Sequence, residues 1–332
     1  RLPPSTRRFA EFLVALALTA LAGCAATLVT NRPDATIVDV ASRRVIGEAA
    51  LVDALAHVRF RLLGELHDDP EHHAIRARLV GEIARRGVHP AVVFEQFDLE
   101  HDAALVAAQI PGATPETLAT AGRLDRKGWA WPMHAPIIAA ALAAHLPIRA
   151  GNLSRSAITA LTGGRDDAVA RATERRWLPR LRAAPWSAAQ GRTLNAEIVE
   201  SHCNMLPADV VPRLVEGERM RDAAMAQALV DAASDDGAIL IAGDGPVRAN
   251  LGVPVYVHAP GLPGATATSI SVGFVESDAP PGTPVVLDER AVEQLVADHP
   301  GFDYLWVTPR IARADPCAEF SRQSKPSPRT AG

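Results

Sequence analysis

The 332-residue sequence lacks an excess of basic charge and is poor in cysteine and tyrosine. Its net charge of −4 offers no basic field, which argues against nucleic acid as a partner. Tyr256 and Tyr304 are the only tyrosines, so a site that depends on a tyrosine ligand has few candidates. Aromatic residues make up 5% of the chain, whereas aliphatic residues are ample, as in a globular protein with a sizeable core.

The N-terminal segment has the pattern of an export signal. Two arginines precede an apolar run at 12–21, and residues 21–24 read Leu-Ala-Gly-Cys. The run is too short for a membrane span. It resembles a bacterial lipoprotein signal peptide, which implies removal of 1–23 and lipidation of Cys24. No acidic residue follows Cys24 at once, which favours the outer membrane, facing the periplasm or the surface. The alternatives are an ordinary export signal or a buried hydrophobic start.

The remaining chain is long enough for one large domain or two small ones. We expect a tether at 24–35, an α/β domain at 36–320 and a disordered polar tail at 321–332. In an oxidising compartment Cys203 and Cys317 can pair and tie the tail to the body of the domain. Two free buried thiols are the alternative.

A strand-to-helix corner at 61–73 concentrates polar residues. An apolar strand ends before Glu65 and His67, which are two positions apart and therefore point the same way on an extended chain. Asp69 is a good N-cap and is followed by proline, which predicts a helix over 70–86. Because sites on parallel sheets lie at the carboxyl ends of strands, we interpret Glu65 and His67 as site residues.

Two further histidines, His72 and His73, fall in the first turn of that helix. His72 shares a helix stripe with Ile75 and Leu79 and therefore leans inward. His73 is equally well explained as a solvated polar residue. Three imidazoles and several carboxylates are thus expected at one corner.

Polar residues follow three more expected strands. These strands, at 91–94, 147–150 and 238–242, are followed by Glu95, Asn152 and Asp244. Strands joined by helices run parallel, so these residues are expected at the edge that carries Glu65. Asn152 and Asp244 each adjoin glycine and are also ordinary turn residues. Because Asn152 and Asp244 follow strands in the same way as Glu95, we favour the interpretation that all three belong to a functional site.

The order of the segments predicts an α/β fold, with a mostly parallel sheet flanked by helices. Additional strands are expected at 36–40, 58–63, 253–257, 269–275 and 304–307. A helical insertion at about 154–233 is expected to form a cap over the sheet edge. It carries His202 at a helix end, where a histidine is also simply a favourable partner of the helix dipole.

Several segments together resemble the ChaN-like haem-binding lipoproteins of the Tiki superfamily (haem-binding uptake). They are Gly64-Glu65-Leu66-His67 with His72-His73, Phe94-Glu95-Gln96-Phe97, the helix at 221–226, and the stretches 202–207, 243–254 and 315–317. The resemblance covers 37–320. It implies an α/β sheet with a helical cap, and haem binding during bacterial iron acquisition.

One departure from that family lies after the late strand. Members usually have Gly-Asn-Gly-His-Val, whereas this chain reads Gly-Asp-Gly-Pro-Val at 243–247. Pro246 can neither bind a metal nor transfer a proton, so a mechanism that needs an imidazole at this position is in doubt. Asp244 adds an acid to an already acidic corner.

The first functional hypothesis is haem binding. Haem needs an apolar surface, one or two axial donors, and cations near its propionates. His67, His72 or His202 can supply the axial donor, and Arg221 or Arg248 can meet propionates. A homodimer that holds haem between two subunits fits a shallow site.

The second hypothesis is a metal-dependent hydrolase, a peptidase or esterase of the same superfamily. His67 would then bind a divalent metal, with His72, or act as a base, and Glu65 or Glu95 would be its partner in activating water. The absence of histidine at position 246 counts against this hypothesis, because an open catalytic metal site normally has three protein ligands. The third hypothesis is that the acidic, imidazole-rich corner holds a metal ion but catalyses no reaction. We favour haem binding.

Overall fold

The computed structural model describes residues 35–162, 168–315 and 317–318. The expected signal peptide at 1–23, Cys24, the tether up to residue 34 and the tail at 321–332 lie outside the described residues. Within the described part, no helix is long and apolar enough to cross a membrane.

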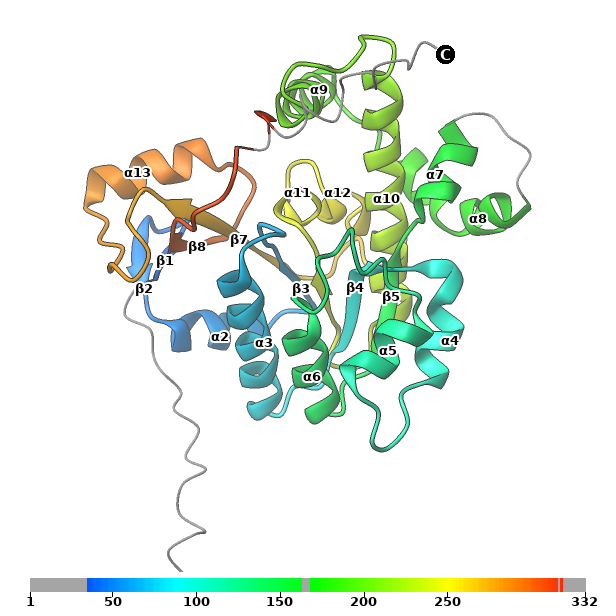
Figure 1. Ribbon diagram of the computed structural model, residues 1–332, viewed down its shortest axis with the longest axis horizontal. Coiled ribbons are helices and arrows are strands. Elements are labelled where there is room, and N and C mark those ends of the chain that lie inside the picture. Colours follow the sequence, from blue (N-terminus) through cyan, green and yellow to red (C-terminus); the bar gives the residue numbers. More distant parts are fainter. Residues whose placement is uncertain (1–34, 163–167, 316, 319–332) are drawn as a thin grey trace, which may run out of the picture. The chain divides into compact units, whose positions relative to one another are not determined.

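An eight-stranded mixed sheet forms the centre of the domain, in the order β2-β1-β8-β7-β3-β6-β4-β5 (Figure 1). Its strands are β1 Thr36–Asp39, β2 Arg44–Ile46, β3 Phe60–Leu63, β4 Ala91–Asp98, β5 Ile148–Asn152, β6 Ala238–Ile241, β7 Ser269–Ser277 and β8 Tyr304–Pro309. The six strands from β3 to β8 are mutually parallel, and β1 pairs antiparallel with both β8 and β2. The expected mostly parallel α/β sheet is therefore confirmed.

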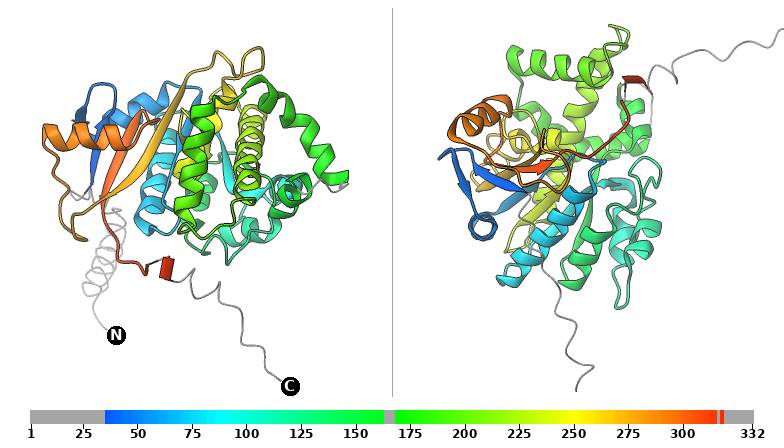
Figure 2. Two further views of the ribbon diagram at one scale, coloured as in Figure 1. Left: turned by 90° about the horizontal axis from the view of Figure 1, so that it is seen from above. Right: turned by 60° about the vertical axis from the view of Figure 1, so that its left-hand side comes forward.

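Helices cover both faces of the sheet (Figures 1 and 2). On one face the core contains residues from α2 Glu48–Ala56, α3 Pro70–Arg85, α4 Asp102–Ala107, α5 Pro115–Ala121 and α6 Ala135–Ala143. On the other it contains residues from α7 Arg155–Thr162, α8 Ala168–Ala183, α10 Val211–Ala232, α12 Val253–Val257 and α13 Glu289–Asp298. Alternate residues of each central strand enter opposite cores, as the pleat requires: Leu63 faces α3, whereas Leu62 faces α10.

The corner after β3 forms as its sequence predicts. Asp69 is the N-cap of α3 and accepts a hydrogen bond from the Glu71 amide at 2.8 Å, and Pro70 occupies the first turn. The helix then buries the stripe that contains Ile75, Leu79 and Ile83 against the sheet. This packing fixes the direction of the first turn and hence of the loop between β3 and α3.

One local prediction was wrong, and one strand was missed. The segment 253–257 is the short helix α12 and not a strand, because Pro254 has no backbone N–H for a sheet ladder but suits the first turn of a helix. The short strand β2 was not expected. Its residues are mostly exposed, so it lacks the buried apolar pattern that marks the other strands.

The insertion at 154–233 is helical, as expected, but most of it covers a face of the sheet. Helix α10 packs on β4, β5 and β6, and α7 and α8 pack on α10. Helix α9 Ala188–Ser201, which begins with a capping box at Ser187, lies beyond the carboxyl ends of the central strands (Figure 1). Only this part of the insertion is positioned as a cap.

A disulfide joins Cys203, just after α9, to Cys317, with an S–S distance of 2.09 Å. The predicted pairing is thus present, and it ties the segment after β8 to the cap. The two cysteines are 114 positions apart.

Reduction of this disulfide is expected to lower the free energy of unfolding by about 2–4 kcal/mol, because it releases a long closed loop in the unfolded chain. Urea unfolding with and without reductant measures the difference. The Cys203→Ser, Cys317→Ser double variant is the control and should be insensitive to reductant. Equal stability of oxidised and reduced protein would contradict the expectation.

Candidate functional site

Glu65 lies at the carboxyl edge of the sheet because the chain turns directly after β3. The turn is tight against the neighbouring strand ends: a Cβ on Gly64 would lie 2.0 Å from the Asp244 Oδ1. Only glycine permits this approach. The Glu65 carbonyl also accepts a hydrogen bond from the Asp244 amide at 3.1 Å, which fixes the two strand ends side by side.

The Glu65 carboxylate is the centre of a buried polar cluster. Its side chain is 2% exposed, and its Oε1 accepts hydrogen bonds from three donors. These are His67 Nδ1 at 2.7 Å, His134 Nε2 at 3.3 Å and Gln96 Nε2 at 3.4 Å. A carboxylate with this number of donors is stabilised in its ionised form.

Arg76 provides the counter-ion on the other side of the carboxylate. Its Nη2 contacts Glu65 Oε2 and donates to His73 Nδ1 at 3.0 Å, while Nη1 donates to the Ala242 carbonyl at 3.3 Å. Burial lowers the pKa of Arg76 to about 9, and the nearby Asp244 and Glu95 oppose this shift. The guanidinium therefore stays charged at neutral pH and balances the acids around it.

The contacts of His73 define its tautomer. Its Nε2 lies 3.0 Å from the His67 carbonyl, which can only accept, so Nε2 carries the proton. Burial lowers the pKa of His73, so the ring is neutral and Nδ1 accepts from Arg76. His73 is thus a buried residue that positions the His67 backbone through a hydrogen bond. The alternative that we considered, a solvated polar residue, is not what the structure shows.

His67 presents its ring to solvent at the edge of this cluster. Its side chain is 50% exposed, and Nδ1 is held by Glu65, which leaves Nε2 pointing away from that carboxylate. The ring lies over Gly243, where a Cβ would be 3.0 Å from Nε2. Trp129 packs edge-on against the ring, with centroids 5.0 Å apart. An imidazole that is oriented by a carboxylate at one ring nitrogen is the usual arrangement of a histidine that binds a metal through the other.

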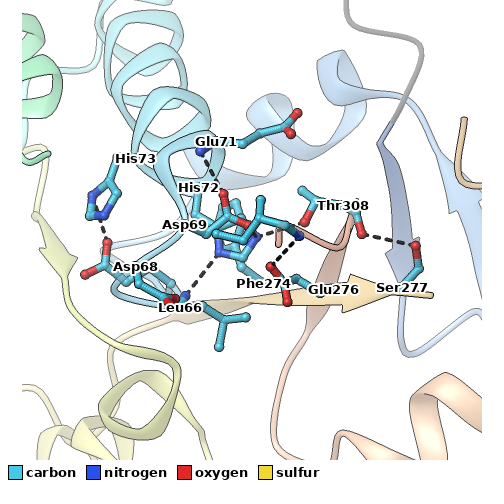
Figure 3. A network of polar contacts seen from close by, with 12 residues as sticks. Leu66, Asp68, Asp69, Glu71, His72, His73, Phe274, Glu276, Ser277 and Thr308 are labelled. Carbon is cyan, nitrogen blue, oxygen red and sulfur yellow. Dashed lines mark hydrogen bonds and ion pairs between the residues drawn. The ribbon is translucent and has the colours of Figure 1, made fainter. Parts of the chain in front are cut away.

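His72 lies apart from this cluster, on the other side of the α3 N-terminus (Figure 3). It is fully buried; Nδ1 accepts from the Leu66 amide at 3.1 Å and Nε2 donates to Thr308 Oγ1 at 3.0 Å. Burial lowers its pKa to about 3, so it stays neutral. With both ring nitrogens engaged, His72 braces the loop after β3 against β8 and has no nitrogen left for a metal or haem.

The same loop is held from outside by Arg313, in the segment after β8. Its guanidinium donates to both carboxylate oxygens of Asp68, at 2.8 and 3.0 Å, and also pairs with Glu276 at the end of β7. Asp68 is the residue directly after His67. The exposed imidazole is therefore carried on a loop that is clamped from both sides.

Glu95 and Asp244 complete the acidic edge. Glu95 accepts a hydrogen bond from the Gly243 amide at 2.8 Å, and Asp244 accepts from the Phe274 amide at 3.1 Å. Burial raises the pKa of Asp244 to about 7, and the Phe274 amide and Arg76 oppose the shift. Both acids thus crosslink neighbouring strands at this edge. Asp244 follows β6 as predicted, whereas Glu95 lies within β4, which continues beyond the predicted end at 94 to Asp98.

The raised pKa of Asp244 predicts a pH-dependent stability. Between the ordinary pKa of 3.8 and about 7, the unfolded chain releases a proton that the folded chain retains, so stability falls as pH rises through this range and then levels. In Asp244→Asn this loss should be smaller, by about 1–3 kcal/mol. Urea unfolding across this pH range measures it. The exposed Asp209→Asn control should keep the wild-type profile, and an unchanged profile in Asp244→Asn would contradict the assignment.

Four other expected site residues have separate local roles. Asn152 is buried and accepts from the Leu153 amide at 2.8 Å, and the His202 ring bonds the Ile198 carbonyl as α9 ends. Arg221 pairs with Glu218 at 3.3 Å, and Arg248 makes two bonds to Glu197, at 2.8 and 2.7 Å.

Glu65, His73 and His134 also form a candidate metal site, since one ligand atom of each lies within 4.8 Å of the others. The donor types suit a divalent transition metal. However, Arg76 occupies the Glu65 Oε2 and His73 Nδ1 atoms that such an ion would need. The arrangement therefore fits an internal guanidinium in place of a resident metal.

Sequence comparison assigns the chain to a family. A family model described as haem-binding uptake, Tiki superfamily, ChaN matches residues 51–257. The chain belongs to this family. The matched segment runs from α2 to α12 and includes Glu65, His67, Arg76 and His134. No protein with a curated description matches the chain.

One solved structure supports the fold of this ChaN-family chain. A structure described as cofacial haem binding to ChaN of Campylobacter jejuni has a TM-score of 0.62 and 18% identity, covering 83% of this chain and 98% of that one. An erythromycin esterase mutant in its open conformation has a TM-score of 0.41 and 13% identity, covering 86% and 99%. At 18% identity, the match to the Campylobacter jejuni structure shows a shared fold.

Arg76 and His134 are parts of the Glu65 cluster that our reading of the sequence missed. Arg76 lies three and four positions after His73 and His72, on the buried face of α3, so a charged residue within an apolar stripe was a usable signal. His134 directly precedes α6 and follows no strand, so the pattern of polar residues after strands does not mark it. Its approach to Glu65 depends on the packing of α6 on α3, which no local pattern reveals.

Proposed function

We propose that this chain binds haem at the open carboxyl edge of the sheet, with His67 as the iron ligand. The observation that carries the proposal is the half-exposed His67 ring, whose Nδ1 is held by the buried Glu65, so that Nε2 is not engaged by that carboxylate. The membership of the haem-binding uptake family supports it. Trp129 offers an aromatic surface beside the ring.

The residues present fit haem better than a catalytic metal. Haem brings its own iron and needs from the protein an axial donor and an apolar contact surface. Here His67 would supply the donor, Glu65 would fix its tautomer and ring orientation, and Trp129 would pack against the macrocycle. Arg76 keeps Glu65 ionised and thereby keeps His67 in place.

A haemin titration of the purified full chain, followed through the Soret band, tests the proposal. Saturable binding with a shifted band is expected. Metal analysis of the protein as purified tests the second candidate, a metal-dependent hydrolase, in which an ion at Glu65, His73 and His134 would have to displace Arg76. About one equivalent of zinc or manganese without haem binding would replace the haem proposal with that candidate.

We further propose that the chain is a lipid-anchored protein of bacterial iron acquisition, attached through Cys24. The lipoprotein-like signal at 1–24 and the family support this location and role. Labelling of expressing bacteria with a radioactive fatty acid is expected to mark the chain but not Cys24→Ser. A label that survives this substitution would exclude the anchor.

We also propose that haem is shared between two copies of the chain. His67 lies at an open surface, where one subunit covers only part of a porphyrin, and the similar Campylobacter jejuni protein is described as binding haem cofacially. Light scattering should report a dimer that requires haemin. A monomer at saturating haemin would contradict this arrangement.

A further inference from the structure

A small cavity lies between α9, α10 and the segment α11 Asp244–Val247. Its volume is about 80 Å³, room for several water molecules or a small organic group. Its lining combines apolar residues with three acids and one arginine: Trp186, Leu194, Pro246, Leu251, Glu197, Glu218, Asp222 and Arg248. Neither Glu65 nor His67 lines it, so it is distinct from the proposed haem ligand.

Two of the three acids in this cavity already have a counter-ion. Glu197 pairs with Arg248 and Glu218 pairs with Arg221. The third, Asp222, is 7% exposed, and among the residues that the structure describes it has no hydrogen-bond or ion-pair partner. A buried carboxyl group without a partner is costly, and a ligand cation would remove that cost.

The electrostatic surroundings agree with this reading. Burial, together with the nearby Glu218 and Glu95, raises the pKa of Asp222 well above its ordinary value, whereas Arg248 and Arg221 lower it. The acids around Asp222 thus outweigh the neighbouring arginines. A cation is therefore the ligand that this carboxyl group lacks.

The shape of the cavity favours an organic cation over a metal ion. In the described part of the chain, Glu65, His73 and His134 are the one group of three such residues with metal-ligand spacing, and the three acids of the cavity do not form such a group. The apolar lining residues instead complement a short hydrocarbon stem. Trp186 already carries the Arg219 guanidinium 5.0 Å from its ring centroid, which shows that its environment accepts such a group.

We propose that the cavity between α9, α10 and α11 binds the ammonium or guanidinium head of a small free organic cation, with Asp222 as its counter-ion. The apolar lining residues Trp186, Leu194 and Leu251 hold the stem of the ligand. Glu218, on the same helix, provides a second acceptor. The site does not depend on haem.

Titration of the full chain with ethylguanidinium and with ethylammonium tests the proposal. Indole N–H signals in NMR spectra are the readout, and Trp186→Phe identifies the signal of Trp186. A saturable shift of that signal is expected. Asp222→Asn keeps the shape of the side chain but not its charge, and should weaken binding at least tenfold. Asp209→Asn, an exposed acid outside the cavity, should leave the affinity unchanged.

Two further measurements keep the test decisive. If Asp222→Asn does not fold, Glu218→Gln, at a partly exposed position, should still weaken binding severalfold. His67→Ala should bind both cations normally, which separates this site from the haem proposal. Absence of a saturable shift, equal affinity in Asp222→Asn, or binding only of an arginine-containing peptide in place of the free cations would overturn the proposal.

Discussion

The His67→Ala variant is expected to bind haemin at least about 100-fold more weakly than the unchanged chain, a loss of about 2.7 kcal/mol. The imidazole is the exposed member of the Glu65 cluster, and its Nε2 points away from the carboxylate that holds Nδ1. Folding should change little, because the ring is half exposed and outside both cores. A haemin titration with circular dichroism as the folding check measures both.

Matched variants sharpen this test. His89→Ala removes an exposed histidine at the opposite edge of the sheet and should leave haemin binding intact. Glu65→Gln keeps the ring of His67 but weakens its orientation, so a loss of about tenfold is expected. Full haemin affinity in a folded His67→Ala protein would move the haem site elsewhere.

The Arg76→Met variant is expected to lose about 3–5 kcal/mol of folding free energy, because it leaves the buried Glu65 carboxylate without its counter-ion. The Arg76 side chain is fully buried, contacts Glu65 and lies close to Asp244 and Glu95. Urea unfolding gives the loss. Adding Glu65→Gln should recover part of it, since the uncompensated charge is then removed.

Arg78→Met is the matched control for that measurement. Arg78 lies two positions along the same helix, pairs with Glu48 and has a side chain 29% exposed. A partly exposed pair of this kind contributes about 1 kcal/mol or less. Equal losses in the two variants would show that Arg76 acts only by packing, and the internal counter-ion would have to be abandoned.

The sheet and the main site edge could be predicted because both depend on local signals. Apolar runs end at Glu65, Glu95 and Asp244, and strands joined by helices run parallel, so these residues had to meet at one edge. The same rules located α3 through its Asp69 cap. They could not locate β2, which lacks a buried pattern.

The partners within the site could not be predicted, because they depend on contacts between distant segments. The sequence predicted that His72 faces inward. It could not predict that His72 Nε2 is engaged by Thr308, because that residue lies 236 positions away in the chain. Arg76 could pair with any of several acids at the edge; the packing of α3 selects Glu65. Asn152, which we grouped with the site, instead accepts from the next residue, as a turn residue does.

The clamp from Arg313 to Asp68 has a consequence for synthesis. These residues are 245 positions apart, so the loop that carries His67 emerges from the ribosome early but receives its outer ion pair only after almost all of the described chain has been made. A nascent chain arrested before residue 313 would lack that restraint. The loop that carries His67 is therefore fully restrained only when translation of the domain is nearly complete.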